Sequence, residues 1–406
     1  MNTLEAKFQI VTPMFLGGSD QIADGIRPAS IKGALRFWWR ALNWARCLQE
    51  RDGDEVQALR YLHAEEARLF GLAASEKGGK QMGGQGVFLL QVAEAKTSVV
   101  GQPFGPLNNG QTYLLGQGIT KYFKDEKITR CVRNAIRERG TFTLKVIFRP
   151  GTRTEDKSQV RSAINALELL GALGSRARHG LGSIAGSTEM TRDEYVKAVQ
   201  ELLRPTLYAS SEPPFTAFSG QSRVDISITG KDALSLLNNV GLEQQLYRSY
   251  GRNGLVNGTQ AERNFTGDHD LIFDAINGTT PPQAPERVVF GLPHNYRFTS
   301  GSEATVNYVI REEDKPNKDK DARRSSPLLL HIHPVSKGGF VVVHTLMPAK
   351  FLPNVTNIQI VTWRDKKNRK DEYDTYAIQP SPHWQVLTDY LNRFIANGGE
   401  VIHGKQ

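Results

Sequence analysis

The clearest chemical pattern in this sequence is a set of three cations that recur at every fourth position. Lys32, Arg36 and Arg40 stand at i, i+4 and i+8, so a helix places them on one side. Guanidinium groups bind phosphate through paired hydrogen bonds, which suits such a ridge to a nucleic-acid backbone. Trp39 lies beside the ridge, and we expect it to stack on a base. The alternative interpretation is a solvated amphipathic helix with buried tryptophans.

A second pattern places basic residues among glycines between positions 171 and 183. Its members are Gly171, Gly174, Arg176, Arg178, His179, Gly180 and Gly182. Glycine lets the backbone approach a ligand closely, and amides together with arginines form an anion cradle, which fits RNA phosphate. No Gly-Lys-Ser/Thr follows a strand, and the predicted helix precedes the loop, so neither a Walker loop nor a dinucleotide fingerprint is present. A plain turn is the alternative.

Further basic residues are spaced three or four apart at Lys127, Arg130, Arg133 and Arg137, which predicts a helical face that is either solvated or part of the basic surface.

His331 and His333 project from one face of a predicted strand. Because no cysteine or acidic residue accompanies them at metal spacing, we predict no metal site there. His179 is the histidine whose basic surroundings would suit a general acid or base.

Composition narrows the class of protein. The chain has 406 residues, of which 39% are hydrophobic and 23% charged, and this profile excludes disordered, collagenous and membrane-spanning classes. The net charge is +9, and residues 1–190 hold 26 lysines and arginines against 18 acidic residues. The basic surplus therefore lies in the first half, where it favours a polyanionic partner.

Two features of the sequence favour a cytoplasmic protein. Cys47 and Cys131 form no CxxC pair, which predicts two free thiols in a reducing compartment. The N-terminal segment lacks the charged start and long apolar core of a secretion signal, and no run reaches the roughly 18 apolar residues of a membrane span.

Hydrophobic periodicity predicts the elements that position these residues. In the first half we expect strands at 4–10, 87–92, 142–148 and 181–185, helices at 30–46, 54–70 and 158–171, and a flexible loop at 77–86. Ser30 is placed to cap the first of these helices. The order of these elements resembles the split β-α-β unit of a ferredoxin-like sandwich.

The pattern restarts beyond residue 205. Strands are expected at 224–228, 287–290, 305–310, 328–333 and 340–346, helices at 231–250, 268–276 and 382–396, and exposed charged loops at 312–324 and 364–374. We therefore predict an α+β chain with two sandwich domains, 1–205 and 206–406.

Several of these segments also carry a family resemblance. They are TPMFLGG (12–18), RPASIKGALRFWWRAL (27–42), LFG (69–71), GALGSRARHGLGS (171–183), GLP (291–293) and RRSSPL (323–328). The glycine loop by itself resembles the RAMP superfamily at large. The ordered set resembles the family of first RAMP subunits of the Cmr complex, the type III-B CRISPR effector, over about four fifths of the chain.

The resemblance implies two ferredoxin-like, RRM-related domains in tandem with insertions. It also implies a non-catalytic subunit without cofactor or metal, near the 3′ part of the guide crRNA, that helps to capture single-stranded target RNA in antiviral defence. Its implied partners are the guide crRNA, the target RNA and other Cmr RAMP subunits, with no membrane. The family's basic helix and glycine loop map onto Lys32, Arg36, Arg40, Arg176 and Arg178, and Trp38 and Trp39 match its aromatic pair. Segments 312–321 and 364–374 match nothing in the family.

Two alternatives stay open. One is a metal-independent RAMP endoribonuclease that processes guide precursor RNA with His179 as acid or base. The other is an assembly protein whose basic surface binds acidic protein neighbours instead of RNA.

Overall fold

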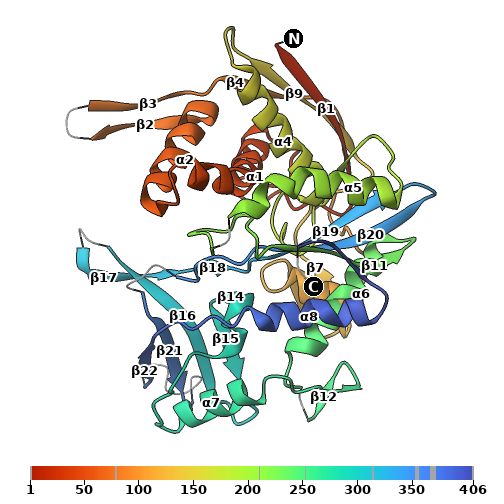
Figure 1. The fold of residues 1–406 in the computed structure, drawn as a ribbon. Coiled ribbons are helices and arrows are strands. Elements are labelled where there is room, and N and C mark those ends of the chain that lie inside the picture. Colours follow the sequence, from red (N-terminus) through yellow and green to blue (C-terminus); the bar gives the residue numbers. More distant parts are fainter. Residues whose placement is uncertain are drawn as a thin grey trace. The chain divides into compact units, whose positions relative to one another are not determined.

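A computed structural model describes residues 2–77, 80–209, 211–251, 253–312, 315–352, 356–365 and 372–404 (Figure 1). The chain forms two compact units. The first comprises Met1–Leu242, Leu329–Pro348 and Phe394–Gln406, and the second comprises Glu243–Leu328 and Ala349–Arg393.

The first unit contains an antiparallel sheet with the strand order β10-β1-β9-β4. Its strands are β1 (Thr3–Ile10), β4 (Phe88–Lys96), β9 (Thr141–Phe148) and β10 (Ile184–Gly186), and its helices are α1 (Pro28–Gln49) and α4 (Thr154–Leu170). Phe8 pairs with Phe142 across β1 and β9, and their rings stack 5.2 Å apart. Along the chain the order is β1, α1, β4, β9, α4, β10, as the periodicity predicts.

A second four-stranded sheet in the same unit has the order β19-β20-β11-β23. It is built from β11 (Arg223–Gly230), β19 (Leu328–Val335), β20 (Gly339–Leu346) and β23 (Glu400–His403), with α6 (Ala233–Arg248) and α8 (Gln385–Ala396) between them in sequence. The sequence of element types repeats that of the first sheet, interrupted by the two segments that form the second unit. The predicted boundary at residue 205 falls inside the 3-10 helix η1 (Arg204–Tyr208) and remains a prediction.

The second unit has its own antiparallel sheet and core. Its strands are β15 (His294–Arg297), β16 (Glu303–Glu312), β17 (Lys315–Ala322), β21 (Ile358–Trp363) and β22 (Asp374–Ile378), with α7 (Thr266–Ile276). Ile272 of α7 packs with Val306, Ile358 and Ile360 of the sheet. The α+β class predicted from the sequence is therefore confirmed.

The remaining elements are short or connect the sheets. They are α2 (Glu55–Phe70), β2 (Gly71–Lys77), β3 (Lys80–Gln85), β5 (Val99–Val100), α3 (Asn109–Leu115), β6 (Thr120–Phe123), β7 (Ile128–Cys131), β8 (Ala135–Ile136), α5 (Arg192–Leu203), β12 (Leu255–Val256), β13 (Thr259–Gln260), η2 (Glu286–Phe290), β14 (Gly291–Leu292) and β18 (Arg324–Ser325). No helix among the described residues is both long and apolar enough to span a bilayer.

Some sequence predictions about local structure are wrong. The expected loop at 77–86 contains β3, which pairs with β2, and the expected loop at 312–324 contains β17, which pairs with β16. Segment 287–290 lies in the 3-10 helix η2, because a short buried apolar run has no decisive period. Within the expected loop at 364–374, residues 366–371 lie outside the described residues.

The predicted basic helix at 127–137 is also wrong. A turn around Lys127, whose φ is +53°, joins β6 and β7 into a hairpin, and β8 follows. The charges there recur every three or four residues, but no apolar stripe recurs with them, and burial of such a stripe is what stabilises a surface helix.

Candidate nucleic-acid interface

Helix α1 presents the predicted ridge, but it begins differently from the prediction. Arg27 is the N-cap residue and makes no capping hydrogen bond with its side chain, while Pro28 occupies the first turn. Proline suits this position because its missing N–H is unpaired there in any helix. Ser30 therefore lies within the first turn, and the prediction that it caps the helix is wrong.

The two arginines of the ridge share one carboxylate. Glu66 of α2 accepts a hydrogen bond from Arg40 Nη1 at 2.7 Å, and its Oε1 lies 3.0 Å from Arg36 Nε. Arg36 also donates from Nη2 to the carbonyl of Gly71. The side chains of Arg36 and Arg40 remain 32% and 37% exposed, whereas that of Glu66 is 10% exposed. One buried anion thus holds two cations in place, and part of each guanidinium still faces solvent.

Lys32 is the third cation of the ridge, and its surroundings differ from those of Arg36 and Arg40. No ion pair joins Lys32 to a carboxylate in the described part of the chain. Its pKa is lowered, first by partial burial of the ammonium group and then by the neighbouring Arg36 cation. Both effects disfavour the charged form, and a phosphate placed beside Lys32 would counter them.

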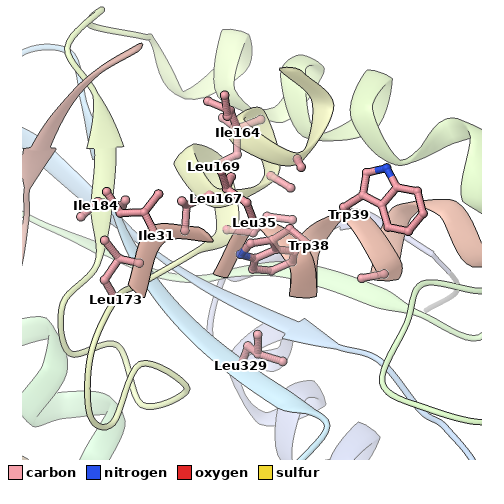
Figure 2. Packing of buried hydrophobic residues seen from close by; sticks show 14 of the residues in the cluster. Ile31, Leu35, Trp38, Trp39, Ile164, Leu167, Leu169, Leu173, Ile184 and Leu329 are labelled. Atoms are coloured by element: carbon pink, nitrogen blue, oxygen red, sulfur yellow. The ribbon is translucent and has the colours of Figure 1, made fainter. Parts of the chain in front are cut away.

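Trp39 does not belong to the surface. Its side chain is 0% exposed, its Nε1 donates to Gln159 Oε1 of α4 at 3.0 Å, and its ring meets that of Phe70 edge to face. Figure 2 shows Trp38 and Trp39 on α1 in the same cluster of buried residues as Leu35 and Leu167. The prediction that Trp39 stacks on a base is therefore wrong, and the alternative of buried tryptophans is confirmed.

The glycines of the loop at 171–183 are required by the fold itself. A Cβ atom on Gly174 would lie 2.7 Å from the carbonyl oxygen of Phe15, and one on Gly182 would lie 2.0 Å from that of Leu173. Both residues also have positive φ angles, +93° and +69°. The loop packs on the segment after β1, where Ser175 N donates to Phe15 O at 2.9 Å. These glycines permit close backbone packing, irrespective of any ligand.

The basic residues of this loop point to different neighbours. Arg176 donates from Nε to Leu115 O at 2.6 Å and from Nη2 to Gln117 O at 2.9 Å. Arg178 lies over the Phe37 ring of α1, 5.4 Å from its centroid. His179 N donates to Arg176 O at 2.8 Å, which closes the turn. Arg178 thus joins the loop to the helix that carries the ridge.

Packing does not require a glycine at position 33, in contrast to the glycines of the loop. Gly33 is an exposed residue inside α1, and apart from its chain neighbours and the helix's own backbone, no atom of the described residues lies within 4 Å of the position that its Cβ would occupy. Glycine in a helix interior costs about 1 kcal/mol relative to alanine. The open surface at Gly33 lies between Lys32 and Arg36 in sequence, so it leaves the helix backbone accessible beside the ridge.

Replacing Gly33 with alanine should raise the free energy of unfolding by about 0.5–1 kcal/mol, because helix propensity improves and nothing is displaced. Urea denaturation followed by tryptophan fluorescence measures this change. Gly174→Ala, where the new Cβ meets backbone, is the opposing control and should destabilise the protein. A destabilised Gly33→Ala variant would contradict the open surface.

The histidines of the second sheet are buried. His331 Nε2 lies 3.2 Å from His333 Nδ1, and the two side chains contact each other in the core. Groups of three or more candidate metal ligands are absent from the residues that the structure describes. Cys47 and Cys131 are both free and buried, and burial raises the pKa of Cys47 to about 11, which disfavours the thiolate form at neutral pH.

Sequence reasoning missed two residues. Glu66 occupies the apolar stripe of α2 together with Ala58, Leu62 and Leu69, and an acidic residue in such a stripe indicates a buried ion pair. Arg133 was assigned to a helix, whereas it lines a pocket beside the glycine loop. Only the tertiary structure brings Arg133 to that place.

A family model identifies the class of protein to which the N-terminal part of the chain is similar. Residues 7–185, which include α1 and the whole glycine loop, match the family model of the RAMP superfamily. The resemblance to this superfamily is thus confirmed for the segment that carries the ridge. No curated protein sequence matches the chain.

A comparison with solved structures then identifies particular proteins with a similar fold. Cmr1 from Pyrococcus furiosus has a similar fold over 100% of this chain and 99% of its own, with 17% sequence identity and a TM-score of 0.52. Two cryo-EM structures of the type III-B Cmr-beta complex with cognate target RNA each contain a chain 10% identical to this one. Each of these matches covers 97% of this chain and 98% of the chain in the complex, and the TM-scores are 0.43 and 0.44. The chain has a Cmr1-like fold with a RAMP-superfamily segment at its N-terminal end.

Proposed function

We propose that this protein is a non-catalytic, RNA-binding subunit of a type III-B CRISPR effector complex. The observation that carries the proposal is the fold shared with Cmr1 along the entire chain, combined with the RAMP-superfamily match over residues 7–185. In this role the subunit lies near the 3′ part of the guide crRNA, beside another RAMP subunit, and helps to capture single-stranded target RNA.

The first unit supplies the RNA-binding surface in this proposal. Lys32, Arg36 and Arg40 contact the sugar-phosphate backbone along α1, and the loop with Arg176, Arg178 and His179 extends the same surface. Phosphate contacts fix the position of an RNA strand without reading its sequence. The open backbone at Gly33 lets a strand approach the helix between the cations.

The domain organisation forms part of the proposal. Each four-stranded sheet, with its two helices in the order β-α-β-β-α-β, is assigned to a ferredoxin-like, RRM-related domain. The second unit then consists of insertions into the second of these domains.

Substitution of Lys32 tests the proposed surface with little structural cost, since no carboxylate among the described residues pairs with it. Lys32→Gln should weaken binding of single-stranded RNA about fivefold for unrelated sequences alike, and should reduce the salt slope of log K by roughly 0.7. Fluorescence anisotropy with two unrelated RNAs, in the purified chain and in the reconstituted complex, measures both effects.

Lys197→Gln is the matched control, because Lys197 is an exposed lysine on helix α5 of the same unit. It should leave the affinity within about twofold of the unmodified protein. Equal effects of the two substitutions would contradict a localised site. A loss confined to one RNA sequence would contradict backbone contact.

The enzymatic alternative makes a different prediction. A metal-independent endoribonuclease would cleave guide-repeat RNA in the presence of a chelator and would lose this activity in His179→Ala. The proposal expects binding without cleavage. Ultraviolet crosslinking in the assembled complex tests the assembly-protein alternative, because RNA adducts should map to 30–46 or 171–183 if these segments bind RNA.

A further inference from the structure

A pocket of about 440 Å³ opens beside the glycine loop in the first unit. Three segments that are distant in sequence form its walls: the loop after β1 with Gly17, Gly18 and Gln21, the turn before β8 with Arg133, and the glycine loop with Gly174 and Ser175. Its volume lies in the range of small-ligand sites, about 300–1,000 Å³, and suits a single nucleotide unit.

Arg133 supplies the charge of this pocket. Its Nη2 donates to Gln21 O at 3.0 Å, and no carboxylate pairs with it within the described ranges. The Nε atom is buried and likewise has no partner among the residues that the structure describes. By contrast, nearby Arg130 forms an ion pair with Glu126. Arg133 is therefore a cation without an ion-pair partner in the described part of the chain, and leaving its buried Nε without a hydrogen bond costs free energy.

The other walls agree with an anionic ligand. No acidic residue lines the pocket, and its lining includes Ser175 and Gln21, whose side chains carry hydrogen-bond donors. Gly17 packs against the backbone of the same loop, because a Cβ there would lie 2.5 Å from the carbonyl oxygen of Ile22. A guanidinium with a hydroxyl and backbone in a concave site is the chemistry that binds phosphate.

We propose that the Arg133 pocket binds one phosphate of the RNA strand. This inference rests on the proposed RNA-binding function and extends the RNA path from the ridge and the glycine loop to the loop after β1. Arg133 provides the charge, and Ser175 and Gln21 provide additional donors. The phosphate belongs to a polynucleotide, so neighbouring phosphates bound elsewhere on the surface hold it in the pocket.

The test compares Arg133→Gln with Arg130→Gln, which removes the same charge from the same part of the chain without altering the pocket. Arg133→Gln should weaken binding of single-stranded RNA about five- to tenfold and reduce the salt slope by roughly 0.7, whereas Arg130→Gln should change affinity less than about twofold. Arg133→Lys, which keeps the charge, should restore most of the affinity. Thermal melts of each variant verify that the fold is retained.

The outcomes separate this inference from the proposed function. If Arg133→Gln binds RNA normally while Lys32→Gln is impaired, the pocket assignment is wrong and the proposed function stands. If the unmodified protein binds no RNA either alone or in the reconstituted complex, both are wrong. Uridine monophosphate and inorganic phosphate serve as competitors. Tight binding of either one by itself, with no added affinity for RNA, would overturn the assignment to a strand phosphate.

Discussion

Replacing Trp39 with alanine is expected to lower the free energy of unfolding by about 3–5 kcal/mol, the cost of deleting a large buried aromatic side chain. The indole is fully buried between α1, α2 and α4, and its removal would leave a cavity and deprive Gln159 of its hydrogen-bond donor. Total stability of a domain is typically about 5–15 kcal/mol, so this single change removes a large part of it. Urea denaturation at neutral pH measures the loss.

Trp39→Phe serves as the graded control. It keeps most of the ring volume and loses the hydrogen bond to Gln159, so we expect a cost of about 1–2 kcal/mol. RNA affinity of the Phe variant should match that of the unmodified protein under conditions where both are folded. The opposite pattern, unchanged stability with lost RNA affinity, would restore Trp39 as a stacking residue and contradict its burial.

The second large effect is expected from pH. Burial lowers the pKa of His331 and of His344 to about 3, and it lowers the pKa of His333 well below its ordinary value of 6.5. The unfolded chain binds protons at these histidines near pH 6.5, whereas the folded chain does not. Stability from the neutral side chains is therefore complete above about pH 6.5 and is lost as the pH falls toward 3.

The magnitude follows from the linkage relation. Each histidine contributes a slope of about 1.4 kcal/mol per pH unit below its unfolded pKa, so the three together should lower the free energy of unfolding by about 4 kcal/mol between pH 7.5 and 5.5. Urea denaturation across a pH series measures this slope. Stability that stays constant or rises on acidification would contradict the burial of neutral histidines.

Matched substitutions assign the effect to particular residues. His331→Gln removes one titrating group and should reduce the loss between pH 7.5 and 5.5 by about 1.4 kcal/mol. His63→Gln, at an exposed position on α2, is the control for removing an imidazole that is not buried. Because Ile332 N donates to Ser183 Oγ and Leu330 N to Arg178 O, the strand with His331 also supports the glycine loop. Acid should therefore weaken RNA binding along with stability.

Much of the first sheet could be predicted because its signals are local. Residues 4–10 and 142–148 alternate between apolar and polar types, and strands form there because one face of each must be buried. The helix with Lys32, Arg36 and Arg40 was predicted from its apolar stripe for the same reason. The predictions failed where local periodicity is short or where charge spacing was used in place of hydrophobic spacing, as at 287–290 and 127–137.

The sequence by itself determined the α+β class, the elements of the first four-stranded sheet, those of the second except β23, the basic face of α1 and the RAMP resemblance. These properties depend on the period of apolar residues and on the identity of neighbouring residues along the chain. Tertiary structure alone decided that Trp39 is buried, that Glu66 holds both Arg36 and Arg40, and that Arg133 shares a pocket with Gly17 and Gly174. Burial and pairing depend on residues far away in the sequence, and no local pattern contains that information.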